Sequence, residues 1–565
     1  MSTQFGKFSE ITYTRPNIHQ LKKDMVKLLT QFINAKDFAS ADKLFFERNE
    51  LYAKLMTTYT VAHIRHDINT ADKYYEQEVT YLLNHLALLL PLQRKANKAM
   101  LKTPYKRQFI EKYGDMMFKD AETFEKTSSW KNIPLSIRMN KLTMQYSKLV
   151  AMAKVDFNGE QCNFYGLLKH MQDTDRQIRK SAYEAFAGLY AKLAPELDEI
   201  YTKLIKLRIR SAKNAKFSNY IDFMYLTRGR YDYTQSDVAK FRNQILDTVT
   251  PLCCELIEQQ RQRIGVDKMH IYDESILFAD GNADPIGDKD YLLQKTLEMY
   301  QQLSQETKEF FEFMTDHQLF DLETKPNKHM GGYCITMLEY QAPFIFSNFN
   351  GTAADVQVLT HEAGHCFNMY LSMRQNVLPN ISSTAEVNEI HSKSMEMFTY
   401  PYWQVFFGGK TDKARYAHLV DTLCTLPYMC TVDEFQHEIY SHPRMNADQR
   451  RATWRALEKK YMPWRDWDGN AYMESGGFWM QKQHIFLYPF YYIDYALAQM
   501  GAYEFYGRSK IEPTKAWDDY VNLCRAGGSK SYLELLELAN ISSPFADCTV
   551  ERAINYIKPE LDKAP

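Results

Sequence analysis

Two histidines and a glutamate near the middle of the chain have the spacing of a metal-binding active site. His361, Glu362 and His365 form the pattern H-E-A-G-H. On a helix, side chains four residues apart lie on one face, so both imidazoles can bind the same metal ion. Glu362 would then lie close enough to act as general base toward a water molecule on that metal, as in zinc-dependent hydrolases. We therefore expect one catalytic zinc ion (Zn2+) per chain.

A catalytic zinc ion needs a third protein ligand, since such sites use three ligands and leave one position open. The segment 382–398 contains four residues of suitable chemistry, which are Glu386, Glu389, His391 and Glu396. A helix here would place Glu389 and Glu396 on the same face. One of them could bind the metal while the other holds a ligating imidazole in place. The residues alone do not select among the four.

Composition and charge indicate a globular protein that binds neither nucleic acid nor membranes. Of 565 residues, 45% are hydrophobic and 25% are charged, and Lys+Arg 69 against Asp+Glu 70 gives a net charge of -1. The most apolar run, 81–92, is too short to span a bilayer, and the first ten residues do not resemble a signal peptide. Nine cysteines without C-x-x-C spacing are typical of a reducing compartment. We expect a cytoplasmic enzyme, and the sequence does not indicate its oligomeric state.

Hydrophobic periodicity predicts a mainly α-helical fold. Apolar residues recur at three-to-four spacing from residue 16 to about 150. A helix capped by Asp173 or Thr174 should follow, and a second helical stretch is expected over 197–214. Residues 280–288 form the clearest loop, and the helical pattern resumes from 291 to about 315.

One small sheet is expected beside the active centre. Residues that favour β-structure concentrate at 333–346, directly ahead of the H-E-A-G-H motif. We therefore expect a sheet near 330–350. We also expect an N-terminal helical domain over 1–195 and a catalytic domain over 196–565.

At this point the motifs resemble those of a known family. H-E-A-G-H, followed 28 residues after its first histidine by E-I-H-S, resembles the thimet oligopeptidase and oligoendopeptidase F family of zinc metallopeptidases. The motifs G-G-Y-C, D-E-F-Q-H and the C-terminal A-G-G-S resemble the bacterial branch, closest to the Pz-peptidase-like oligopeptidases. The resemblance covers the chain from about residue 169 onward.

The resemblance implies a fold, an activity and a third ligand. The fold is a multi-helical zincin-type metallopeptidase with a deep substrate channel, and the activity is hydrolysis of internal peptide bonds in short oligopeptides. The family's third zinc ligand is the glutamate of E-x-x-S, which falls on Glu389 with Ser392. Glu386 ranks second because no serine follows it at the same distance.

A tyrosine-rich segment, Q-H-I-F-L-Y-P-F-Y-Y-I-D-Y, offers groups that could stabilise an oxyanion. Tyrosine hydroxyls are neutral hydrogen-bond donors at pH 7. By the resemblance, four residues of this segment match the family's substrate-contacting positions: His484, Tyr488, Tyr492 and Tyr495. The spacing is one residue shorter than in the family, which leaves the choice between Tyr491 and Tyr492 open. His484 and Tyr495 rank first.

Two further segments have two interpretations each. Residues 347–350 could lie on an exposed sheet edge that binds an extended peptide through main-chain hydrogen bonds, and an ordinary edge explains them equally well. Gly476-Gly477 could let a loop close over substrate, and ordinary turn glycines explain them equally well.

Two other functions compete with the endopeptidase. A helical zinc carboxypeptidase would share H-E-x-x-H, but the H-E-S-Q pattern of such enzymes is not found in the sequence. A non-catalytic peptide-binding protein with a decayed metal site is disfavoured because Glu362, which zinc affinity does not require, is present.

Overall fold

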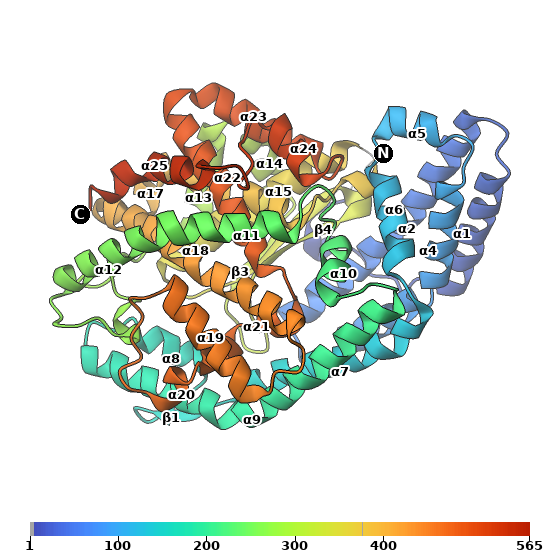
Figure 1. The fold of residues 1–565 in the computed structure, drawn as a ribbon. Helices are drawn as coiled ribbons and strands as arrows, with labels where there is room; N and C mark the ends of the chain where they lie inside the picture. Colours follow the sequence, from blue (N-terminus) through green and yellow to red (C-terminus); the bar gives the residue numbers. More distant parts are fainter. Residues whose placement is uncertain (1–4, 376) are drawn as a thin grey trace. The chain divides into compact units, whose positions relative to one another are not determined.

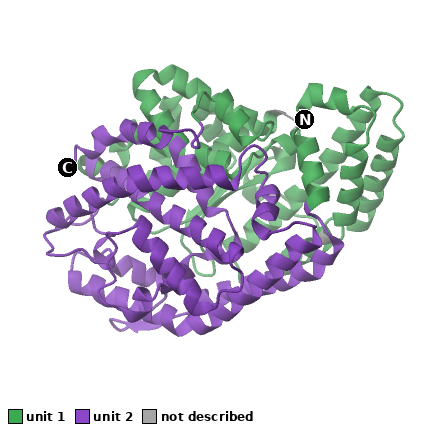
Figure 2. Ribbon diagram, viewed as in Figure 1, with its two compact units in different colours: residues 1–126, 284–411, 501–542 green, residues 127–283, 412–500, 543–565 purple. Residues whose placement is uncertain are grey.

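The computed structural model describes residues 5–375 and 377–565 (Figure 1). The fold is mainly α-helical, as the periodicity predicts, and contains two small sheets where one was expected. The described residues form two compact units (Figure 2), each assembled from three separate segments of the chain. Unit 1 comprises 1–126, 284–411 and 501–542, and unit 2 comprises 127–283, 412–500 and 543–565. The expected boundary between residues 195 and 196 stays a prediction.

Unit 1 contains the N-terminal helices and the H-E-A-G-H motif. Its helices are α1 (Ile18–Ile33), α2 (Phe38–Ile68), α3 (Lys73–Ala87), α4 (Leu90–Leu101), α5 (Lys106–Tyr113), α6 (Met116–Thr127), α13 (Lys289–Leu303), α14 (Gln305–Asp316), α15 (Ala353–Ser372), α16 (Ala385–Phe398), α17 (Gln404–Phe407), α23 (Pro513–Ala526) and α24 (Tyr532–Leu538).

Unit 2 contains the tyrosine-rich segment. Its helices are α7 (Ile133–Met152), α8 (Phe164–His170), α9 (Arg176–Asn214), α10 (Tyr220–Thr227), α11 (Gln235–Gln244), α12 (Thr250–Ile264), α18 (Thr411–Ser441), α19 (Ala447–Tyr461), α20 (Ala471–Glu474), α21 (Gln483–Leu487) and α25 (Thr549–Leu561). One further helix, α22 (Tyr492–Ile511), includes the boundary between the units at residue 500.

Two helical predictions need correction. The stretches expected on either side of residue 195 form one continuous helix, α9, which contains Pro195 in its interior. Its N-cap is Asp175, one or two residues later than predicted. The pattern expected over 291–315 is two helices, because Ser304 ends α13 and caps α14 through its side chain. The apolar spacing does not change at Pro195, where the helix continues, or at Ser304, where one helix ends and the next begins. Periodicity alone therefore could not distinguish one helix from two.

The sheet ahead of the motif has three strands in the order β3-β5-β4. Strand β3 (Phe320–Glu323) pairs parallel with β5 (Ala342–Phe349), and β4 (Tyr333–Met337) pairs antiparallel with β5. The sheet expected near 330–350 is therefore confirmed, although β3 begins before the predicted range. A second element, the hairpin of β1 (Val155–Phe157) and β2 (Glu160–Cys162), was not predicted as strands; its turn is Asn158-Gly159, and both residues have positive φ.

Helix α15 packs against α16 and against strands β5 and β4 of the small sheet. Ala363, Cys366 and Phe367 are fully buried and anchor the helix through its apolar face. At its start, the Asp355 carboxylate accepts hydrogen bonds from the backbone amides of Asn350 and Gly351. None of the helices within 5–375 and 377–565 combines the length and the apolar character that crossing a membrane requires.

Candidate metal centre

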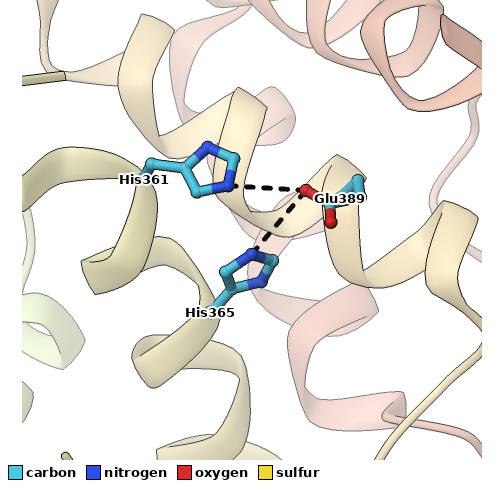
Figure 3. A group of neighbouring side chains, drawn as sticks. All are labelled: His361, His365 and Glu389. Carbon is cyan, nitrogen blue, oxygen red and sulfur yellow. Dashed lines mark ion pairs between the residues drawn. The ribbon is translucent and has the colours of Figure 1, made fainter. Parts of the chain in front are cut away.

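Three side chains of unit 1 converge on one point (Figure 3). Oε2 of Glu389 lies 3.4 Å from Nε2 of His361 and 3.7 Å from Nε2 of His365. One ligand atom from each residue lies within 4.8 Å of the other two. Among the described residues, this is the group of histidine, cysteine and acidic side chains that could hold a metal ion. The two histidines come from α15 and the glutamate from α16.

The two histidines are presented by helical spacing. They lie four residues apart on α15, and their ring centroids are 4.9 Å apart with the rings nearly perpendicular. Both are partly exposed, whereas Ala363 and Cys366 on the opposite face are buried. A metal bound here would therefore keep one side open, as a catalytic site requires.

Gly364, between the two histidines, allows α16 to pack close to α15. A Cβ atom at this position would lie 2.7 Å from Cα of Ser392, 2.8 Å from the His391 carbonyl oxygen and 2.9 Å from Cβ of Met395. No side chain larger than hydrogen fits between the two backbones without moving them. This close approach brings Glu389 to the histidines. Sequence reasoning missed the role, although the glycine stands inside the motif.

Residues around the three ligand atoms hold two of them in place. Nδ1 of His361 lies 2.5 Å from Oε1 of Glu396, so the carboxylate accepts its hydrogen and Nε2 is left to face Glu389. The hydroxyl of Ser392 lies 3.2 Å from Oε2 of Glu389. Glu389 and Glu396 thus both face His361, as the helical spacing predicts. The other two candidates, Glu386 and His391, are buried on α16 outside the group.

Burial and the two carboxylates shift the pKa values of the histidines in opposite directions. Burial opposes the charged form of His361, but Glu389 and Glu396 outweigh it and raise its pKa to about 10. Burial lowers the pKa of His365 to about 4. Burial also opposes ionisation of Glu389, yet the hydrogen bond and charge of the histidines lower its pKa to about 2. The site therefore offers one carboxylate, one neutral imidazole and one imidazole that must lose a proton before it binds a metal.

The donor set fits zinc. Two imidazole nitrogens and one carboxylate oxygen are a common set for catalytic zinc. Glu362, next to the first histidine, is 8% exposed, and burial raises its pKa to about 7. Such a carboxyl group can accept and return a proton near neutral pH.

The predicted oxyanion-stabilising residues lie together in unit 2. The ring centroid of His484 is 6.0 Å from that of Tyr488, 4.8 Å from that of Tyr492 and 5.9 Å from that of Tyr495. Tyr491 also belongs to this cluster, because its ring stacks on His484 at 5.9 Å. The structure therefore brings the four predicted residues of this segment into one aromatic cluster.

The tyrosines of this cluster differ in exposure and contacts. Tyr488 is 53% exposed, whereas Tyr492 is 8% exposed and its hydroxyl accepts a hydrogen bond from Nζ of Lys482. The guanidinium of Arg228 lies 4.9 Å from the ring centroid of Tyr491 and donates to the carbonyl of Pro489. Tyr488 is thus more accessible to a ligand than Tyr492.

Residues 347–349 end β5, the central strand of the sheet. The pairing of β5 with β4 stops at Phe346, whereas its pairing with β3 reaches Phe349, so these residues extend beyond β4. Binding of an extended peptide at 347–350 stays a prediction. Nζ of Lys328 donates to the Ser347 carbonyl, and the Asn348 side chain donates to the carbonyls of His329 and Gly331. The 328–331 loop thus covers this part of β5. Strand β4 has a hydrogen-bonded neighbour on one side only and forms an edge of the sheet.

The glycine pair at 476–477 is explained by packing. Gly476 has φ +92°, and a Cβ atom there would lie 2.0 Å from the Arg451 carbonyl oxygen. A residue held against α19 in a left-handed conformation is a turn glycine, so the structure favours that interpretation over a closing loop.

Comparison with known proteins identifies the family to which these features point. The model of Peptidase family M3 matches residues 169–554, and that of the Peptidase M3 N-terminal domain matches residues 8–128. Oligopeptidase PepF of Bacillus subtilis (strain 168) is 20% identical over 96% of this chain and 84% of its own. A solved structure of Pz peptidase A with an inhibitor is 41% identical over 99% of both chains, with a TM-score of 0.93. A Bacillus anthracis structure assigned to oligoendopeptidase F is 39% identical over 99% of both chains, with a TM-score of 0.89. The resemblance stated from the sequence motifs is confirmed.

Proposed function

The chain belongs to peptidase family M3 and is a peptidase, and on this premise we propose that it is a zinc-dependent endopeptidase acting on short oligopeptides. The observation that supports zinc is the convergence of His361, His365 and Glu389, with ligand atoms within 4.8 Å of one another. Internal cleavage of oligopeptides is supported by the relatives' names, oligopeptidase and oligoendopeptidase F homolog. The cytoplasmic location stays a prediction.

In this proposal His361, His365 and Glu389 hold the metal, and Glu362 moves the protons. Zinc, when bound, supplies the Lewis acid that activates a water molecule and polarises the scissile carbonyl. Glu362 takes the proton of that water and later delivers it to the leaving amine. Its pKa, raised by burial to about 7, suits both transfers at neutral pH. Glu396 keeps the His361 ring oriented with Nε2 toward the metal position.

We assign stabilisation of the developing oxyanion to His484 and Tyr495, with Tyr488 and Tyr492 behind them. The support is the family resemblance of these positions and their clustering around the His484 ring. Tyr492 ranks low because it is buried and contacts Lys482, which leaves its hydroxyl less accessible to a substrate. Donors aimed at developing charge typically contribute several kcal/mol to catalysis.

The decisive experiment digests a mixed-length peptide library with the wild type and with Glu362→Gln, and counts bound zinc in both. We expect internal cuts in short peptides by the wild type and loss of these cuts in the variant, which retains one zinc. Glu47→Gln is the matched control because Glu47 is a surface residue of α2 paired with Lys43. Release of single C-terminal residues by the wild type would identify a carboxypeptidase instead. A wild type that binds zinc and cuts nothing would refute the catalytic proposal.

A second experiment tests the oxyanion assignment. Because one lost oxyanion donor costs about 10²- to 10³-fold in kcat, we expect losses of this order for His484→Ala and Tyr495→Phe with zinc content unchanged. Tyr165→Phe is the control, since Tyr165 is 64% exposed on α8. Full activity in both His484→Ala and Tyr495→Phe would exclude the aromatic cluster from the mechanism.

A further inference from the structure

The N-terminal helices of unit 1 enclose a cavity that the peptidase mechanism does not use. It measures about 510 Å³ and is lined by residues of α1, α2, α3 and α4 and by the short turn at 378–379 (Figure 1). Pockets that bind small molecules typically measure about 300–1,000 Å³. The cavity is therefore large enough for a small ligand.

The walls of this cavity are almost entirely apolar. Met25, Leu29 and Leu89 line its interior and are each 6–7% exposed. Tyr52 and Leu90 line it as well and are 40% and 51% exposed, so they mark an opening to solvent. A ligand with an apolar body could enter between them and bury that body against the helices.

Three polar side chains line the cavity, and one of them, Gln93, donates its amide hydrogen to Asn97. The other two lie together. Arg48 and Asn49 follow each other on α2, on the helix face that also presents Tyr52 and Met56 to the cavity. Asn49 is 7% exposed, and its Nδ2 donates to no residue that the structure describes. Arg48 is partly buried and likewise forms no ion pair within the described part of the chain. Burial lowers the pKa of its guanidinium, with no neighbouring charge offsetting the effect.

Burying the Asn49 amide and the Arg48 guanidinium without partners costs folding free energy. A donor removed from water without an acceptor is unfavourable, and an unpaired cation is more so. No acidic side chain lines the 510 Å³ cavity within the described residues. Asp120 lines a smaller neighbouring cavity of about 260 Å³, which shares Arg48. The larger cavity is therefore the place where an external anion would find both donors and no competing carboxylate.

We propose that this cavity binds a monocarboxylate with an aliphatic body, through Arg48 and Asn49. A planar carboxylate can accept two hydrogen bonds from the guanidinium while the amide of Asn49 supplies a further donor. A single cation neutralises one negative charge, whereas a phosphate dianion would leave charge buried without compensation. The apolar walls match an alkyl chain or leucine-like side chains. The proposal is independent of the peptidase activity, because none of its residues belongs to the metal centre.

Two sources offer this chemistry, a medium-chain fatty acid and the free C-terminus of a hydrophobic peptide. Calorimetric titration with decanoate and with N-acetyl-leucyl-leucine distinguishes them. Decan-1-ol and the amide of the dipeptide are the matched uncharged probes. We expect one site per chain for at least one acid, and at least tenfold weaker binding of its uncharged partner.

The variant Arg48→Met tests whether the acid binds in this cavity. Arg48→Met keeps an apolar stem and removes the charge, so it should weaken acid binding at least tenfold and leave binding of the uncharged probe unchanged. Arg107→Met is the control, because Arg107 is 89% exposed on α5. Without ligand, Arg48→Met should melt at the same temperature as the wild type or higher, since it removes an unpaired, partly buried cation.

Three results would overturn the proposal. The first is equal binding of an acid and its uncharged probe by the wild type. The second is that the wild type binds neither acid. Both are measured on the wild type alone. Equal acid binding by wild type and Arg48→Met would place the acid elsewhere, including at the metal centre. If Arg48→Met in that third case also melted below the wild type, Arg48 would serve the fold.

Discussion

Replacing Gly364 by alanine tests whether the close packing of α15 on α16 builds the metal site. The new Cβ atom would lie 2.7 Å from Cα of Ser392 and 2.8 Å from the His391 carbonyl oxygen, both backbone atoms. Because neither can rotate away, the helices must separate. Non-bonded carbons prefer about 3.5 Å, so the required movement is about 0.8 Å.

This movement affects stability and metal affinity differently. Overpacking typically costs about 1–3 kcal/mol, and the better helix propensity of alanine returns about 1 kcal/mol, so we expect a net loss of about 0–2 kcal/mol. Glu389 sits one turn before Ser392 on the displaced helix and would move away from both histidines. Metal–ligand distances tolerate only about 0.2 Å, so zinc affinity should fall about 10- to 100-fold.

Urea unfolding measures the stability of the zinc-free protein, and competition with a chelator measures zinc affinity. The matched control is Gly188→Ala on α9, where a Cβ atom would meet nothing within 4 Å. This control should gain about 0.5–1 kcal/mol and bind zinc normally. If Gly364→Ala instead gained stability like the control and kept wild-type zinc affinity, the role assigned to the close helix contact would be refuted.

Three further predictions concern the metal centre and the core of unit 2. Glu396→Ala frees Nδ1 of His361 and should lower zinc affinity about 10- to 100-fold in chelator competition, whereas Glu47→Ala should not. The pKa of His361 is raised to about 10, so a proton occupies this ligand at neutral pH. Zinc must displace that proton, and its apparent affinity should rise about tenfold per pH unit between about pH 6 and 9, while a flat profile would contradict the protonated state. Asp433→Ala removes the nearer carboxylate, whose Oδ2 lies 2.5 Å from the buried Arg242 guanidinium, and leaves Glu434 at 3.6 Å, so it should cost about 3–5 kcal/mol in urea unfolding. A loss below 1 kcal/mol would mean that water or another group compensates Arg242.

Local spacing accounts for much of the metal centre. His361, Glu362 and His365 stand on one helix at fixed offsets, so the sequence determines that two imidazoles share a face and that the carboxylate is adjacent. The mainly α-helical class follows in the same way from apolar periodicity. The third residue of the group could be selected from sequence only through the family resemblance, because chemistry left four candidates.

Tertiary structure decided what depends on contacts between distant segments. The distance from Glu389 to the histidines is set by how closely α16 approaches α15, which Gly364 controls through the absence of a Cβ atom. The strand that forms the sheet edge depends on pairing order, which spacing along one strand does not encode. Arg48 and Asn49 look like ordinary surface residues of a helix in the sequence. Only the packing of α1 and α4 around α2 places them on the wall of a cavity, since burial belongs to the folded arrangement and not to a residue type.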